Sequence, residues 1–304
     1  MSGDLHCHTR LTDGSMGIED IIALAKNKGL ETIAITDRDC QAGTVRAKII
    51  GERNGIRVIP GVELSSVDGE TSEVVCILCY MPEFADRLEG LCHRNAAATK
   101  RAAQKMMIKT AKRFPITADV IKRCASGSTN LYIPHIMHAL MECGETDGIY
   151  SELYRELFTP ESEANIIEIP AYAETAEVLT AIKDAGGISV LARPASSRDP
   201  EALLDRLVGL GLNGVEVWHP SADKERTDML YAYAKKNKLL MVGGSDFRGM
   251  YTPQPLALGS YLTPKTQLAE LLGYKSKLKR LAKREAALVE KEAAEAAAAL
   301  SVER

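Results

Sequence analysis

The chain has 304 residues, of which 45% are hydrophobic and 26% are charged, and its formal net charge is −3. This length suffices for a full hydrophobic core, and the charge excludes a general attraction to nucleic acid or to an anionic membrane. No apolar run approaches the length of a membrane span, and residues 1–3 lead directly into a strand-like segment without room for a signal peptide. Seven scattered cysteines follow no disulfide spacing, so we expect a cytoplasmic protein with reduced thiols.

Two histidines, His6 and His8, lie in the strand-like segment 4–9. As a β-strand, this segment would point both side chains to the same face, because side chains alternate along a strand. Two imidazoles on one face can bind a single metal ion. Two polar residues at the end of a strand, without a ligand, are the alternative interpretation.

Short apolar segments alternate with helical patterns from residue 18 to residue 80. The spacing predicts helices over 18–28 and 43–54 and strands over 31–36, 57–65 and 73–80. Strands joined by helices in this way are typical of a parallel sheet built from βα units.

The βα pattern stops at Pro82 and returns near Glu174. The intervening residues are mostly helical and include a basic, alanine-rich helix over 93–113 and a second helix that begins at Pro134. We expect residues 82–169 to form a small helical lid, inserted between the two parts of one α/β domain at 1–81 and 170–264.

Three further strands are expected over 188–194, 214–220 and 239–248, preceded by helices over 174–185, 201–210 and 222–236. Residues 265–304 are predicted to form a helical tail. Six of the ten residues 275–284 are basic. A solvated helix face explains this run, and nucleic-acid binding is the alternative.

Polar residues follow the carboxyl end of nearly every expected strand, where parallel α/β folds bind ligands. Their mixture of imidazoles and carboxylates suits a divalent cation. Singly, each has a structural explanation, since Asp13 can form a turn, Asp37 can cap a helix and the arginines can be ion-pair partners. Together they predict a functional site formed by His6, His8, Asp13, Asp37, Arg38, Glu63, Arg193, His219, Asp246 and Arg248.

Several short motifs resemble those of the PHP (polymerase and histidinol phosphatase) family: Asp4-Leu-His-Cys-His8, Thr12-Asp-Gly14, Ala34-Ile-Thr-Asp37, Gly61-Val-Glu63 and Gly244-Ser-Asp-Phe247. The likeness is greatest to its stand-alone small nucleotide phosphoesterases, whose helical insertion carries a Pro-His dipeptide similar to Pro134-His135. The resemblance covers most of residues 4–250. It implies an α/β fold, namely a distorted seven-stranded (β/α) barrel of PHP type with up to three divalent metal ions that hydrolyse phosphate esters.

The resemblance also implies which residues would bind these ions. The first ion would be held by His6, His8, Glu63 and Asp246, all of which are present. Four other histidines of the family are absent. Cys76 and Arg193 stand at those of the second site, and Arg38 and Arg248 at those of the third. Arginine cannot donate a lone pair to a metal, so we expect about one Mn, Zn or Fe ion per chain.

The three arginines would restore three of the four positive charges of two missing divalent ions. We therefore expect Arg38, Arg193 and Arg248 to bind phosphate oxygens, and Arg38 and Arg248 also to stabilise charge during catalysis. We expect Asp13 to be a catalytic residue and to pair with these guanidinium groups. His219 is the candidate acid or base, with a structural role beside Trp218 as the alternative.

The lid supplies two further candidates. His135 is expected to bind the substrate phosphate, because amide groups at a helix start favour an anion. On helix 93–113, a basic stripe is either a substrate contact or, more simply, a solvated face. The stripe consists of Arg94, Arg101, Lys105 and Lys112.

These observations predict a metal-dependent phosphoesterase with a reduced metal centre, acting on a small phosphorylated metabolite such as a nucleotide. A non-catalytic protein that binds a phosphorylated ligand or a partner protein on the same scaffold is the alternative. DNA processing through the basic tail is a third hypothesis, against which the acidic net charge argues. The sequence predicts no membrane partner and leaves the oligomeric state open.

Overall fold

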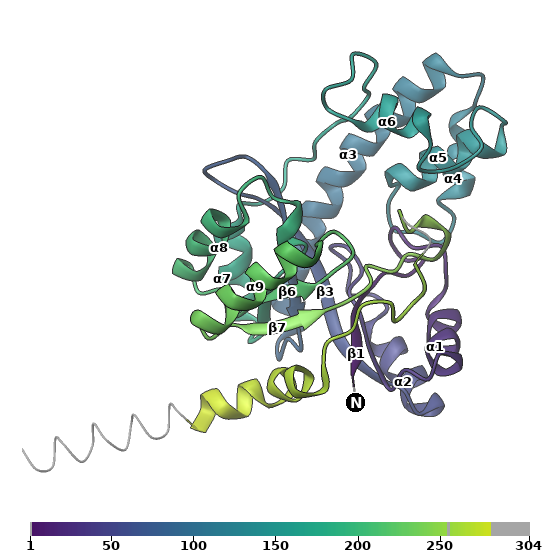
Figure 1. Cartoon of the computed structure of the whole chain (residues 1–304). Coiled ribbons are helices and arrows are strands. Elements are labelled where there is room, and N and C mark those ends of the chain that lie inside the picture. Colours follow the sequence, from purple (N-terminus) through teal and green to yellow (C-terminus); the bar gives the residue numbers. More distant parts are fainter. Residues whose placement is uncertain (1, 254–255, 281–304) are drawn as a thin grey trace, which may run out of the picture.

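The computed structural model describes residues 2–253 and 256–280. At its centre, the described residues form one sheet of seven strands in the order β1 to β7 (Figure 1). The strands are β1 (Gly3–Cys7), β2 (Thr32–Ile35), β3 (Arg57–Val67), β4 (Val74–Tyr80), β5 (Ile188–Leu191), β6 (Gly214–Trp218) and β7 (Leu240–Gly243).

The sheet closes into a nearly complete barrel, because the segment after β7 returns to β1. The His8 amide donates to the Phe247 carbonyl (2.9 Å), and the Phe247 amide donates to the His6 carbonyl (3.2 Å). At the other end of β1, the Gly3 amide donates to the Thr263 carbonyl (3.2 Å). The predicted distorted seven-stranded barrel is confirmed, and its closure brings the segment after β7 beside His6.

One prediction about the sheet is wrong, because the strands are not all parallel. β4 is antiparallel to both β3 and β5, whereas the other neighbouring strands are parallel. Residues 68–73 join β3 to β4, and so short a connection allows a hairpin but no crossover helix. As a result Cys76 pairs with Ser65, close to the site end of β3.

Helices cover the outside of the barrel: α1 (Ile18–Asn27), α2 (Thr44–Asn54), α7 (Thr175–Asp184), α8 (Pro200–Gly209) and α9 (Lys224–Lys236). In α1 the buried residues Ile18, Ile21, Ile22 and Ala25 follow helical spacing, so one face packs on the sheet. α9 begins two residues later than expected, because the Asp223 side chain caps it by accepting from the Arg226 amide. Among the described residues, no helix is both long and apolar enough to cross a membrane.

The part of the barrel interior away from the site is apolar, and the helix over residues 265–280 closes the barrel at that end. Leu268 and Leu271 of this helix are buried against the interior residues Leu5, Leu78 and Val190. The predicted tail is therefore a helix packed on the barrel as far as residue 280. Its remainder, residues 281–304, lies outside the described residues, together with part of the basic run.

The segment after β4 contains α3 (Glu89–Arg113), α4 (Ala118–Cys124), α5 (Ile133–Glu142) and α6 (Glu152–Phe158), which share a hydrophobic core separate from that of the barrel. Figure 1 shows α4, α5 and α6 gathered around the far part of the long helix α3. Barrel loops contact this lid, since the Ser128 hydroxyl donates to the Thr12 carbonyl (2.7 Å) and Tyr251 is buried in the lid core. The exact lid boundaries, 82–169, stay a prediction.

Candidate metal centre

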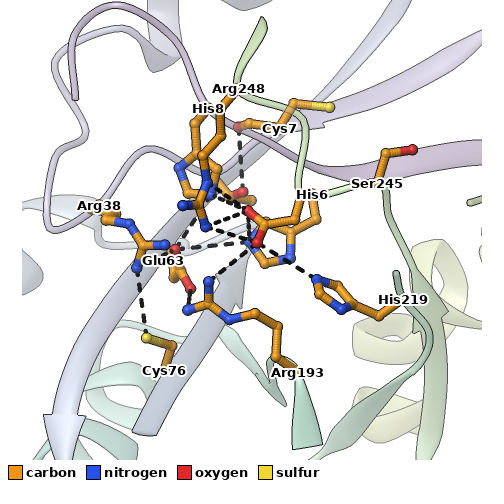
Figure 2. A network of polar contacts seen from close by, with 12 residues as sticks. His6, Cys7, His8, Arg38, Glu63, Cys76, Arg193, His219, Ser245 and Arg248 are labelled. Carbon is orange, nitrogen blue, oxygen red and sulfur yellow. Dashed lines mark hydrogen bonds and ion pairs between the residues drawn. The ribbon is translucent and has the colours of Figure 1, made fainter. Parts of the chain in front are cut away.

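Four side chains meet in what we call the histidine corner: His6 of β1, His8 directly after it, Glu63 of β3, and Asp246 from the segment after β7. Figure 2 shows His6, His8 and Glu63 pointing toward one another. His8 Nε2 lies 3.4 Å from Glu63 Oε2 and 3.1 Å from Asp246 Oδ1. His6 Nε2 lies 3.8 Å and 3.6 Å from the same two atoms. All four residues are buried. The barrel thus brings together the whole ligand set expected for the first metal ion.

Four atoms of the histidine corner are buried without a hydrogen-bond partner in the described part of the chain. One is His8 Nδ1, which lies 3.3 Å from Asp13 Oδ1. The other three, His6 Nε2, His8 Nε2 and Glu63 Oε2, face one another. Arg38 Nη1 lies 3.0 Å from Glu63 Oε2, but it makes an ion pair there rather than a hydrogen bond. A buried polar atom left unsatisfied costs about 1–3 kcal/mol. A divalent ion bound by two imidazole nitrogens and carboxylate oxygens would satisfy these atoms, and this donor set suits Zn, Mn or Fe.

A carboxylate that the strand-end pattern does not predict, Glu216, orients His6 from behind. Burial opposes ionisation of Glu216, but His6 and His219 lower its pKa, so His6 Nδ1 is the donor in their 2.9 Å hydrogen bond. Nε2 of His6 therefore faces the corner. Burial also disfavours the imidazolium, yet Glu216 and Asp246 raise the pKa of His6 to about 10 when no ion is bound. An acidic residue in the middle of the apolar strand β6 is the sequence signal that identifies it.

Arg38, Arg193 and Arg248 form what we call the arginine side of the site, and each contacts two carboxylates (Figure 2). Arg193 lies 2.6 Å from Glu63 Oε1 and 3.2 Å from Asp246 Oδ2. Arg38 lies 2.6 Å from Asp13 Oδ2 and 3.0 Å from Glu63 Oε2. Arg248 lies 2.7 Å from Asp246 Oδ2 and 3.4 Å from Asp13 Oδ2. The expected pairing of Asp13 and Glu63 with guanidinium groups is thus seen in the structure.

These guanidinium groups keep the neighbouring carboxylates ionised. Burial alone would raise the pKa of Glu63, but Arg193 and Arg38 hold it well below its usual range. Arg248 and His6 have the same effect on the pKa of Asp246, and Arg38 and Arg248 on that of Asp13. Three carboxylates therefore face three guanidinium groups. A bound divalent ion would leave the site net positive even when Glu216 is counted, which favours a phosphate ligand.

Two site residues have a left-handed backbone that residues with a side chain seldom adopt. The φ angle is 49° at Arg193 and 47° at Asp246. Such a conformation costs about 1–3 kcal/mol and persists only where surrounding contacts enforce it. At Arg193 the backbone amide donates to Glu216 Oε2 (3.0 Å), so the same glutamate orients both His6 and the turn that carries Arg193.

His219 lies at the edge of the histidine corner. Its Nδ1 accepts from the Ser221 amide (3.0 Å), which in the neutral ring leaves the proton on Nε2. Nε2 lies 3.6 Å from Asp246 Oδ2 and, within residues 2–253 and 256–280, has no hydrogen-bond partner. A ring with its Nε2–H facing the site can donate a hydrogen bond to a substrate oxygen, and the acid or base role expected of His219 stays a prediction.

The contacts of the lid candidates, His135 and the basic stripe on α3, favour a structural or solvated position over a substrate contact. His135 Nδ1 accepts from the Tyr132 amide (3.1 Å), and burial lowers the pKa of His135 to about 4, so the ring is neutral at pH 7. Its role in phosphate binding stays a prediction. On α3, Arg94 pairs with Glu177 and Lys105 with Glu168, and both basic side chains are more than 60% exposed. This geometry favours a solvated face.

A cavity of about 260 Å³ adjoins the histidine corner on the side of β5, β6 and β7. Its polar wall contains Arg193, His219 and Arg248, while Pro220 and Leu256 contribute apolar surface. This volume is close to the lower end of small-molecule pockets. The cavity therefore has room for a small organic group attached to a phosphate at the corner.

Comparisons with known proteins identify the family of the chain. The PHP domain model matches residues 4–159. A phosphoribosyl 1,2-cyclic phosphate 1,2-diphosphodiesterase from Eggerthella lenta is 33% identical over 84% of this chain and 97% of its own length. A 5'-3' exoribonuclease from Haemophilus influenzae is 26% identical over 80% of this chain and 89% of its length. A crystal structure from Bifidobacterium adolescentis, described as a metal-dependent phosphoesterase, superimposes with a TM-score of 0.80 and 29% identity, covering 89% of this chain and 95% of that chain. The chain belongs to the PHP domain family.

Proposed function

We propose that the chain is a metal-dependent phosphoesterase that hydrolyses a small phosphorylated metabolite with a single divalent ion held by His6, His8, Glu63 and Asp246. The observation that carries this proposal is the convergence of three buried ligand atoms without hydrogen-bond partners in the described chain. The reaction class is supported by the names of the relatives from Eggerthella lenta and Bifidobacterium adolescentis.

The bound ion would supply Lewis acidity, lowering the pKa of water and polarising a phosphoryl oxygen. The arginine side would bind the other phosphate oxygens. Each guanidinium has five N–H donors, and the contacts with carboxylates leave some of them free. The three side chains are between 11% and 20% exposed, so a phosphate at the mouth can reach them. His219 would donate a hydrogen bond from its Nε2–H to the leaving oxygen and so stabilise the charge that develops there, since that atom faces the site.

The substrate would place its phosphate between the histidine corner and the arginine side, and its organic group in the adjoining 260 Å³ cavity. This volume fits a sugar or a nucleoside fragment better than a polymer. A small phosphorylated molecule is therefore the proposed substrate class, although one relative is named as an exoribonuclease.

The proposal is tested by elemental analysis of the purified protein together with a hydrolysis panel. The panel contains a cyclic phosphodiester, nucleoside mono- and bisphosphates, and a short RNA with a 5' phosphate. We expect about one Mn, Zn or Fe ion per chain, hydrolysis of a small substrate, and loss of that activity on chelation with recovery on adding metal. Two or three ions per chain would contradict the one-ion centre. Metal-free protein that binds nucleotides without hydrolysing them would support the non-catalytic alternative.

A further inference from the structure

A second cluster of metal-ligating side chains lies on the lid, outside the histidine corner. Cys124 is the last residue of α4, and His138 and Glu142 lie on α5. Each offers one ligand atom, and the three atoms lie within 4.8 Å of one another. The three side chains are partly exposed, so an ion can enter from solvent and keep a water ligand.

The orientation of the two α5 residues suits a shared ion. His138 and Glu142 are four residues apart and lie on the same helix face, with His138 Nε2 3.6 Å from Glu142 Oε1. The other carboxylate oxygen, Oε2, is the one that faces Arg123 (3.4 Å). Glu142 Oε1 thus remains directed at the histidine.

The second ring nitrogen of His138 is held by the lid–barrel contact. His138 Nδ1 lies 2.8 Å from the Tyr251 hydroxyl, which can accept the Nδ1 proton. Metal-binding histidines usually donate their second ring N–H in this way, which fixes the ring and leaves the other nitrogen free to bind. Tyr251 follows Arg248 by three residues, so this hydrogen bond connects α5 to the loop that carries part of the arginine side.

We propose that Cys124, His138 and Glu142 bind a divalent ion of the zinc type, with water as the fourth ligand. Ligand atoms of a tetrahedral zinc site lie roughly 3.3–3.7 Å apart. The 3.6 Å separation of His138 and Glu142 fits this range, and the thiol lies within 4.8 Å of both. Binding replaces the thiol proton of Cys124 by the metal and releases that proton to solvent.

The thiol distinguishes this lid site from the histidine corner. A sulfur ligand favours zinc or cobalt over manganese, whereas the corner has only nitrogen and oxygen ligands. A bound ion would join α4 to α5 next to Tyr251 and so fix the lid on the loop after β7.

Titration of the full chain with Co²⁺ tests the proposal, because cobalt bound to a thiolate absorbs in the near ultraviolet and cobalt bound only to nitrogen and oxygen does not. We expect this band in the wild-type protein and its loss in Cys124→Ser. Cys76→Ser is the matched control, since Cys76 is the thiol beside the arginine side, and it should keep the band. No band in the wild type, or a band that survives Cys124→Ser, would overturn the proposal.

Two further variants keep the test independent of folding and of the proposed catalytic centre. Glu142 is 41% exposed, so Glu142→Gln should fold, and it should weaken zinc binding at the lid by about tenfold or more while the band persists at saturating cobalt. Unchanged affinity would remove Glu142 from the ligand set. His8→Gln alters only the corner and should leave the band intact, whereas loss of the band in that variant would place the sulfur signal at the corner and contradict a lid site.

Discussion

The histidines of the corner and the guanidinium groups of the arginine side contact the same two carboxylates, Glu63 and Asp246, but they differ in whether their polar atoms have partners. In the corner, His6 Nε2 and His8 Nε2 have no hydrogen-bond partner among the described residues. On the arginine side, each guanidinium contacts two carboxylates. Glu63 contacts both groups, since Oε1 faces Arg193, while Oε2 lies 3.0 Å from Arg38 and 3.4 Å from His8. Permanent cations thus balance the carboxylates on one side of the site, whereas the unpartnered atoms on the other side are those to which we assign the proposed ion.

The largest expected effect comes from breaking the corner. His8→Gln removes a ring whose two nitrogens make no hydrogen bond in the described structure, so a specific effect on metal binding is expected. Metal content should fall from about one ion per chain to nearly none, and kcat/KM by about 10³-fold or more, because the ion supplies several kcal/mol of stabilisation. Elemental analysis and steady-state kinetics check this, and full metal content in the variant would contradict the assignment.

The next effect comes from breaking the arginine side. Arg193→Met leaves Glu63 and Asp246 each without one cationic partner, which should lower the free energy of unfolding by about 3–5 kcal/mol in urea denaturation. Millimolar Mn²⁺ should restore more stability to this variant than to the wild type. Arg206→Met is the matched control, because Arg206 is similarly buried and pairs with Asp68 (2.8 Å) away from the site. Equal recovery of both variants would refute the idea that Arg193 replaces a metal ion.

A smaller effect should come from the glutamate behind the corner. Glu216→Gln keeps a hydrogen-bond acceptor for His6 Nδ1 but removes the charge, and we expect metal affinity to fall roughly 10–100-fold. Competition with a metal-binding dye measures this. Glu73→Gln, at a glutamate that bonds Ser197 and pairs with Arg198, should leave the affinity unchanged. Unchanged affinity in Glu216→Gln would limit Glu216 to a structural role.

The smallest expected effect is a pH dependence of the unfolding free energy that comes from His135, in contrast to the arginines, whose charge does not change with pH in this range. The folded pKa of His135, about 4, lies below the unfolded value of 6.5, so its stabilising contribution is present above pH 6.5 and is lost as the pH falls toward 4. Between pH 6.5 and 5.5 the wild type should lose about 1 kcal/mol more unfolding free energy than His135→Gln. Urea denaturation at the two pH values measures the difference. Parallel profiles would mean that His135 titrates normally.

Much of the site could be predicted because strand ends converge whatever the length of the intervening loops. This rule brought His6, His8, Glu63 and Asp246 to one place across 240 residues of sequence, and it placed the three arginines beside them. Their individual roles in binding and catalysis stay predictions, since geometry alone measures neither.

Other features of the structure could not be predicted from the sequence, for physical reasons. An apolar run does not reveal the direction of its strand, so the antiparallel β4 was signalled only by the short 68–73 connection. Glu216 is surrounded by apolar neighbours in β6, and the strand-end rule excludes mid-strand residues. The predicted start of α5 at Pro134 is within one residue of the observed start at Ile133. The hydrogen bond that occupies His135 Nδ1 depends on the backbone of Tyr132, which the helical pattern does not reveal.

The seam between β1 and the segment after β7 has a consequence for biosynthesis. Asp246 follows His6 by 240 residues in the sequence, so at 5–20 residues per second it is synthesised about 10–50 s later. During this interval a nascent chain holds two imidazoles and Glu63 without the aspartate that completes the set. In the proposed one-ion centre, the complete ligand set is therefore available only after the segment that follows the final strand has been translated.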